Sequence, residues 1–148
     1  TGATNDEFTK LKQTAKDLGA TTVFSASEVS MGMQYLGQSG WAVNEIISAM
    51  PGLLDMAAAG GADLATAADI TATVMRAMKI EAADASRVAD IFAKTATGSA
   101  TSIEMLGETL KYAAPIAQGF GLSLEEVSAL TGTMANAGMG WLARCGTV

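Results

Sequence analysis

Carboxylates are the most abundant groups in this sequence that could do chemistry, with 15 Asp and Glu against 9 Lys and Arg among 148 residues. Two pairs are close enough in sequence to be weighed as a general acid and base, Glu125 with Glu126 and Glu81 with Asp84. Neighbouring residues on a helix do not face each other, and Glu126 also fits a helix-capping position. We therefore interpret these carboxylates as surface or capping groups, and the sequence predicts no catalytic residue.

Two residue types that dominate catalytic and metal sites are scarce. The chain has no His and one Cys, Cys145. This excludes His-based nucleophile systems, an internal disulfide and a cysteine metal cluster, and it weakly favours a reducing compartment. Glycines in the segment 57–69 could suggest a phosphate loop, but the Lys and the spacing of that loop are missing, and Asp63 and Asp69 would repel an anion. We expect no cofactor and no metal, and a helix–turn–helix junction at 57–69.

The charge balance argues against a nucleic-acid partner, because the net charge is −6 and the pI is about 4.5. The one basic cluster, Lys10, Lys12 and Lys16, is best explained as a solvated helix face. The longest uncharged run, 127–143, contains three glycines and an Asn, which is unfavourable for a membrane-spanning helix. We expect no signal peptide and no membrane span. A chain that opens without Met is expected to be processed or cut from a larger protein.

Any functional group would be positioned by helices, and the predicted helices begin with a recurring motif in which a Ser or Thr lies three residues before an acid. The hydroxyl accepts a hydrogen bond from a free backbone N–H of the first turn, and the acid reaches back to the capping residue. In two places an apolar pair, Phe24 with Val29 and Leu122 with Val127, predicts a hydrophobic staple across the cap. The five predicted helix starts are Thr4/Glu7, Ser25/Glu28, Thr66/Asp69, Thr101/Glu104 and Ser123/Glu126.

Apolar residues recur at spacings of three and four, which predicts an all-α fold of seven to eight short helices arranged in hairpins. Predicted core stripes include Phe8, Leu11, Ala15 and Leu18 near the start and Val127, Leu130 and Met134 near the end. Pro51 and Pro115 should kink or break their helices. The spacing of the starts varies, which argues against a helical solenoid. Predicted C-caps are Gly19, Gly40, Gly60–Gly61, Gly98, Gly119/Gly121 and Gly138.

Nine Met residues and several small-residue faces are the remaining candidates for partner recognition. Met fills irregular cores and also adapts to several partners. We expect most of these Met side chains in the core, with Met31 and Met56 exposed. Small residues allow close helix approach, so the candidate interaction surface comprises Met31, Gly32, Met56, Ala113 and Ala117.

The order of segments resembles a known family. The succession "LGATTVFSASEV", "QYLGQSGW", "IISAMPGLLDMAAAGGADLATAADI", "RVADIFAKTA", "TSIEMLGETLKYAAPIA" and "GLSLEEVSALTGTMANAG" is similar to the core region of phage and prophage tail tape measure proteins, collinear from Leu11 to Gly138. The resemblance implies a structural virion protein, not an enzyme. It would be made in the host cytoplasm, lie in the tail lumen as ruler and scaffold, contact tail tube subunits, tail assembly chaperones and itself, and leave during DNA ejection.

The resemblance weakens at the C-terminus, where the chain reads "MGWLARCGTV" instead of the Gly, Ser and Ala-rich hairpin usual in the family. We therefore divide the chain into a helical module, 1–138, and an atypical tail, 139–148, that is expected to pack poorly. Two alternatives stay open. The module could be membrane-active, with the helices after Pro51 and Pro115 inserting during genome ejection, or a carboxylate enzyme, which would need two acids converging in a pocket.

Overall fold

The computed structural model describes residues 4–138, and in this range the chain is all-α, as predicted. A short 3-10 helix, η1 (Ala82–Asp84), precedes the fifth α-helix, and the described residues form no strand. The predicted tail, 139–148, lies outside the described residues. The seven α-helices are α1 (Asn5–Thr21), α2 (Ala26–Gln38), α3 (Val43–Gly60), α4 (Leu64–Met78), α5 (Ala85–Gly98), α6 (Ile103–Gly119) and α7 (Leu124–Asn136).

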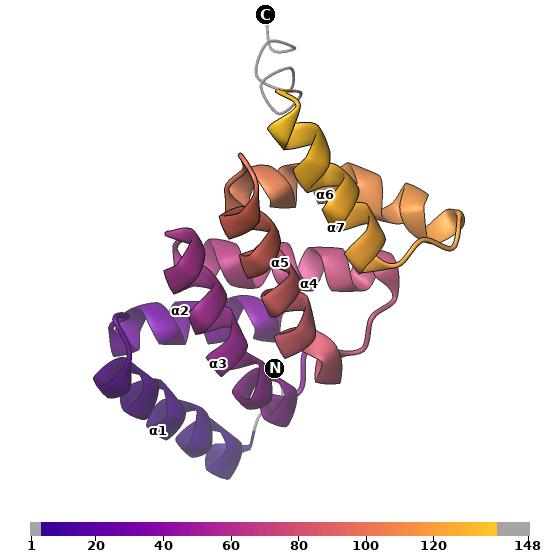
Figure 1. Cartoon of the computed structure of the whole chain (residues 1–148). Helices are drawn as coiled ribbons and strands as arrows, with labels where there is room; N and C mark the ends of the chain where they lie inside the picture. The colour runs from indigo at the N-terminus through magenta and orange to yellow at the C-terminus, as the bar shows by residue number, and fades with distance from the viewer. Residues whose placement is uncertain (1–3, 139–148) are drawn as a thin grey trace, which may run out of the picture.

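The helices form two layers that cross each other (Figure 1). Helices α3, α5 and α7 lie side by side in the front layer of this view, while α2, α4 and α6 lie behind them. Helix α1 packs mainly on α2 and also contacts α3. From α2 to α6, packing within a layer is more extensive than packing between neighbours in sequence, since α4 lies between α2 and α6, and α5 lies beside α3. The core fills the space between the layers, with Leu36, Met50, Leu53 and Phe92 among its fully buried side chains.

The layers repeat at a nearly constant interval, contrary to the expectation from sequence. In the back layer the N-caps Ser25, Asp63 and Ser102 are 38 and 39 residues apart. The odd-numbered helices have N-caps at Thr4, Ala42, Asp84 and Ser123, spaced 38, 42 and 39 residues apart. The longest interval contains η1. Helix positions repeat although residue identities do not, and each hairpin stacks on the one before it as in helical repeat proteins.

Glycine allows the close stacking within each layer. A Cβ atom added at Gly107 of α6 would lie 2.5 Å from Cδ1 of Ile70 on α4, and one added at Gly132 of α7 would lie 3.3 Å from Cγ2 of Thr95 on α5. Carbon atoms in ordinary contact are about 3.5–4.0 Å apart, so a larger residue at Gly107 would force the helices apart. These two glycines therefore mark where the last helix of each layer meets its neighbour.

The prolines do not break their helices, which corrects the prediction of breaks. Pro51 lies inside α3 and Pro115 inside α6, and both helices continue through them. Proline removes one N–H donor, so the carbonyl four residues earlier, that of Ile47 or Lys111, loses its helical partner. Both prolines are exposed, so water can reach the freed carbonyl on the same face.

The predicted helix ends are confirmed where glycine adopts a left-handed backbone. Gly61 follows α3 with φ of 64°, and Gly121 follows α6 with φ of 74°, as the C-cap motif requires; Gly40 and Gly138 also have positive φ. Gly19 is different, because it lies inside α1, two residues before the end of the helix. Lys79 ends α4 in the left-handed region with φ of 55° without being a glycine, and no sequence signal indicated it.

Two predicted core stripes are partly wrong. Phe8 on α1 is 65% exposed, although Ala15 on the same predicted stripe is buried. On α7, Leu130 and Met134 are 56% and 50% exposed, while Ser128 and Thr131 are buried against the rest of the fold. Helix α7 thus buries small and polar residues beside Leu124 and Val127, because α5 approaches it closely at Gly132.

Candidate interaction surface

Three of the predicted capping boxes are confirmed, at the starts of α1, α2 and α7. Ser25 accepts from the Glu28 backbone N–H at 3.3 Å, and the Glu28 carboxylate accepts from the Ser25 N–H at 2.7 Å. The same reciprocal pair forms at Thr4 with Glu7 and at Ser123 with Glu126. Of the predicted staples, Val29 is buried and Phe24 packs on the same core, whereas Val127 is buried but Leu122 is 37% exposed.

Two predicted boxes are wrong, because the helices start at other residues. Helix α4 begins earlier than expected, with Asp63 as N-cap accepting from the Thr66 N–H at 2.9 Å, so Thr66 and Asp69 lie inside the helix. Helix α6 begins one residue later, with Ser102 accepting from the Met105 N–H at 3.2 Å. Thr101 therefore precedes the cap, and Glu104 lies in the first turn without closing a box.

Sequence reasoning missed half a box at the start of α3. Ala42 is the N-cap there and has no side-chain oxygen, but the Glu45 carboxylate still accepts from the Ala42 N–H at 2.7 Å. The sequence signal for this half-box is the acid three residues after the cap, although no hydroxyl accompanies it.

Hydrogen bonding at these caps lowers carboxylate pKa values. The backbone N–H and hydroxyl of the capping Ser or Thr hold the pKa of Glu7, Glu28 and Glu126 below the ordinary 4.5. The hydroxyl and backbone N–H of Thr66 likewise lower the pKa of Asp63. These carboxylates are thus ionised at neutral pH and complement the positive ends of their helices.

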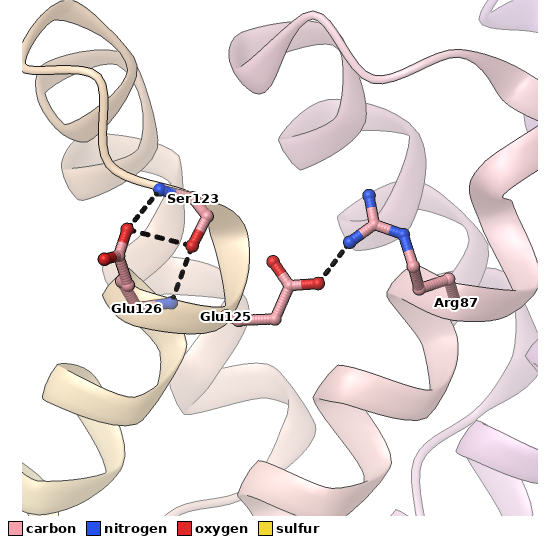
Figure 2. A network of polar contacts seen from close by, with 4 residues as sticks. All are labelled: Arg87, Ser123, Glu125 and Glu126. Carbon is pink, nitrogen blue, oxygen red and sulfur yellow. Dashed lines mark hydrogen bonds and ion pairs between the residues drawn. The ribbon is translucent and has the colours of Figure 1, made fainter.

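The carboxylates weighed as an acid–base pair have structural contacts in Figure 2. Glu126 closes the α7 capping box, whereas Glu125 forms an ion pair with Arg87 of α5. Near the other end of α7, the side chain of Asn136 accepts from the Ala100 backbone N–H at 2.7 Å. Both ends of α7 are thereby linked to α5 or to the residues that follow it. The second pair lies between α4 and α5, where Glu81 is the N-cap of η1 and Asp84 is the N-cap of α5.

Among residues 4–138, no group of three or more His, Cys, Asp or Glu is placed to hold a metal ion. In the same range, no helix is both long enough and apolar enough to cross a membrane.

Most of the predicted interaction surface is covered by the fold itself. Met31 is exposed as expected, but Met56 is fully buried and accepts a hydrogen bond from the Thr71 hydroxyl at 3.8 Å. Gly32 is buried where α2 meets Leu64 of α4. Ala117 is buried too, and Ala113 packs against the core. The small residues serve helix contacts within the module rather than contacts with a partner.

Exposed large apolar side chains occur at both ends of the described chain, with Phe8, Val23, Met31 and Tyr35 at the N-terminal end and a larger group at the C-terminal end. Five residues, on α6, at its C-cap and on α7, define what we call the C-terminal apolar edge. Tyr112, Ile116 and Phe120 recur every four residues toward the end of α6, and this spacing is the sequence signal that indicates the edge. The edge consists of Tyr112, Ile116 and Phe120, exposed by 76%, 62% and 82%, together with Leu130 and Met134.

Comparisons with known proteins agree on one family. The family model described as phage-related minor tail protein matches residues 12–144. The tape measure protein of Pneumococcus phage Dp-1 is 46% identical over 138 residues, which are 93% of this chain and 12% of that protein. The probable tape measure protein of Escherichia phage P2 is 27% identical over 131 residues, 88% of this chain and 16% of that protein. No solved structure matches the chain.

The chain therefore spans less than a fifth of the length of these two relatives. The match nevertheless covers all seven helices except the first seven residues of α1. On this evidence the chain belongs to the phage-related minor tail protein family.

Proposed function

We propose that this chain is a compact helical module of a phage tail tape measure protein, which contributes to tail assembly and to setting tail length through protein–protein contacts. The observation that carries the proposal is the collinear identity of 46% over 93% of the chain with a protein named tape measure protein. The module is a structural part and performs no reaction. Its Glu125 and Glu126 serve an ion pair and a cap instead of converging on a substrate.

The partners that fit this role are tail tube subunits, tail assembly chaperones and other copies of the same protein. The module would be made in the host cytoplasm and lie in the lumen of the virion tail. A net charge of −6 supports a lumenal position, because an acidic surface does not retain the DNA that passes through the tube.

The fold distinguishes two ways of setting length. A helix rises about 1.5 Å per residue, so residues 11–138 would span roughly 190 Å as one continuous helix. Here the longest helix, α3, has 18 residues, and the helices fold back on one another. A compact domain of this size has a radius of gyration of about 14 Å and a width of roughly 40 Å. The folded module therefore adds little length and acts through its contacts.

The test is an in-frame deletion of residues 11–138 from the tape measure gene, with tail length measured by negative-stain electron microscopy. We expect fewer tails, each within roughly 40 Å of the normal length. The matched control deletes an equally long stretch predicted to be continuous helix in the same protein, and it should shorten tails by roughly 190 Å.

Three outcomes would overturn the proposal. Tails shortened by about 190 Å after deletion of the module would mean that the segment is extended in the tail. Tails of normal number, length and infectivity would mean that the module has no role in assembly. Normal tails that fail to infect, combined with binding of the isolated chain to liposomes, would replace the proposal with a membrane-active ejection role.

A further inference from the structure

Helix α6 carries an exposed row of side chains that is acidic at one end and aromatic at the other. Residues four apart on a helix form the ridges with which helices pack on one another. On α6 such a row consists of Glu104, Glu108 and Tyr112, and all three are exposed. We call it the acidic row, and its aromatic end belongs to the C-terminal apolar edge.

Helix α1 carries an exposed row of the opposite charge. This basic row consists of Phe8, Lys12 and Lys16, which are also four residues apart. Phe8 is an exposed aromatic side chain, and neither lysine forms an ion pair in the described part of the chain. The basic row therefore presents an aromatic ring and two free positive charges in one line.

The two rows are distinctive within this sequence. Lys12 and Lys16 are the one pair of basic residues spaced four apart, and Glu104 and Glu108 are the one pair of acids with that spacing. The aromatic residue comes four residues before the lysines on α1 but four residues after the glutamates on α6. The two rows are thus mirror images in sequence order, and they match only when the helices run antiparallel.

The rows cannot meet within one molecule. Helix α1 lies at one end of the stack of helices and α6 at the other (Figure 1). A contact between them therefore requires two molecules. A second copy of this chain carries both the complementary charges and the complementary aromatic residue at the required spacing.

We propose that the basic row of one copy packs antiparallel on the acidic row of a second copy. The paired residues are Phe8 with Tyr112, Lys12 with Glu108, and Lys16 with Glu104. A parallel arrangement with the aromatic residues paired would instead place the lysines beside Ile116 and Phe120, without an acid. Because each contact uses two different faces, a pair of copies keeps a free row of each kind unless a ring closes.

The charges and the aromatic residues have different roles in this contact. Glu108 already pairs with Lys111 at 2.7 Å, but its side chain is 65% exposed and can accept from a second lysine. Exposed ion pairs add little affinity, and their main effect is to fix orientation and register. Packing of the aromatic rings removes apolar area from water. A contact of this size is at the weak end of protein association, so it is measured at chain concentrations up to about 1 mM.

This inference rests on the proposed function in taking another copy as a partner. Association is measured on the isolated chain and tail length on assembled tails, so either result can fail without the other.

Disulfide cross-linking tests which faces meet. Lys12→Cys and Glu108→Cys are made in separate chains that both carry Cys145→Ser, and a disulfide forms only where Cα atoms come within about 7 Å. The mixture of the two chains should form disulfide-linked dimers, whereas each chain alone should form few. The control mixes Lys12→Cys with Lys94→Cys, an exposed position on α5, and should form few dimers. Equal cross-linking of either chain alone would mean that like faces meet, and the proposal would be wrong.

Charge reversal tests the pairing of the two rows by sedimentation. The double variants Lys12→Glu/Lys16→Glu and Glu104→Lys/Glu108→Lys should each raise the Kd of self-association about tenfold or more, because like charges then face each other. A mixture of the two should associate as tightly as the parent. General attraction does not explain that recovery, since a change of four charges on a net charge of −6 leaves both chains negative.

The matched control is Lys79→Glu/Lys94→Glu, which makes the same change in net charge at exposed positions on other helices. It should leave the Kd within about twofold of the parent, whereas an equal loss in the control would mean that only net charge matters. A parent chain that stays monomeric up to about 1 mM would also overturn the proposal. So would reversed chains whose mixture does not recover.

Discussion

Replacing Gly19 with Ala tests how closely α1 approaches the start of α2. A Cβ atom at this position would lie 2.5 Å from the backbone nitrogen of Ala26 and 2.7 Å from its Cα. Overpacking of this kind costs about 1–3 kcal/mol, and backbone atoms cannot rotate away as a side chain can. Alanine inside a helix otherwise gains about 0.5–1 kcal/mol over glycine. We expect a net loss of about 1–2 kcal/mol in the free energy of unfolding, or roughly 2–8 °C in Tm.

The matched control is Gly119→Ala at the last residue of α6. No atom lies within 4 Å of a Cβ built there, and its backbone is not left-handed. This variant should be neutral or more stable by up to about 1 kcal/mol, because alanine restricts the unfolded chain. Urea unfolding of the two variants, measured in parallel, gives the comparison. A Gly19→Ala protein as stable as the parent, or more stable, would refute the close approach.

A double variant identifies which atoms cause the loss. The Cβ of Ala26 lies 3.0 Å from the added carbon, farther than the two backbone atoms. Ala26→Gly removes only that Cβ, so it should not restore the stability of Gly19→Ala. Full recovery in the double variant would mean that the clash is between side chains and that the helix backbones are farther apart.

The remaining predictions concern caps, charge, proline and one buried hydroxyl. Ser25→Ala should cost about 0.5–2 kcal/mol in urea unfolding, whereas Thr101→Ala, just before the true cap of α6, should cost almost nothing. The stability that the ionised Glu28 and Asp63 contribute should be fully present above pH 4.5 and should be lost as the pH falls through their lowered pKa values. In an acid titration followed by circular dichroism, Glu28→Gln should make this loss of stability smaller. Pro51→Ala should raise Tm, since it restores a donor within the continuous α3, and an unchanged or lower Tm would contradict that account. Ser128→Ala should stabilise by about 1 kcal/mol, because the buried Ser128 hydroxyl has no hydrogen-bond partner; a loss of stability would indicate one.

The sequence alone determined the helical content and those helix starts whose hydrogen bonds are local. Ser25 and Glu28 are three residues apart, so their reciprocal hydrogen bonds form within one turn and depend on nothing distant. The same reasoning failed for Thr66 and Asp69, because Asp63 offered a competing cap three residues earlier. Local chemistry could suggest both starts, and in the structure the Asp63 carboxylate accepts from the Thr66 N–H, which makes Asp63 the cap.

The tertiary structure decided which faces are covered. Leu130 and Met134 are more apolar than Ser128 and Thr131, yet the polar pair is buried. The reason is that α5, some 40 residues earlier, approaches α7 at Gly132 and leaves room only for small side chains. Periodicity shows that a helix has an apolar face. Whether that face lies inside the module or at its edge depends on whether a helix distant in sequence packs against it.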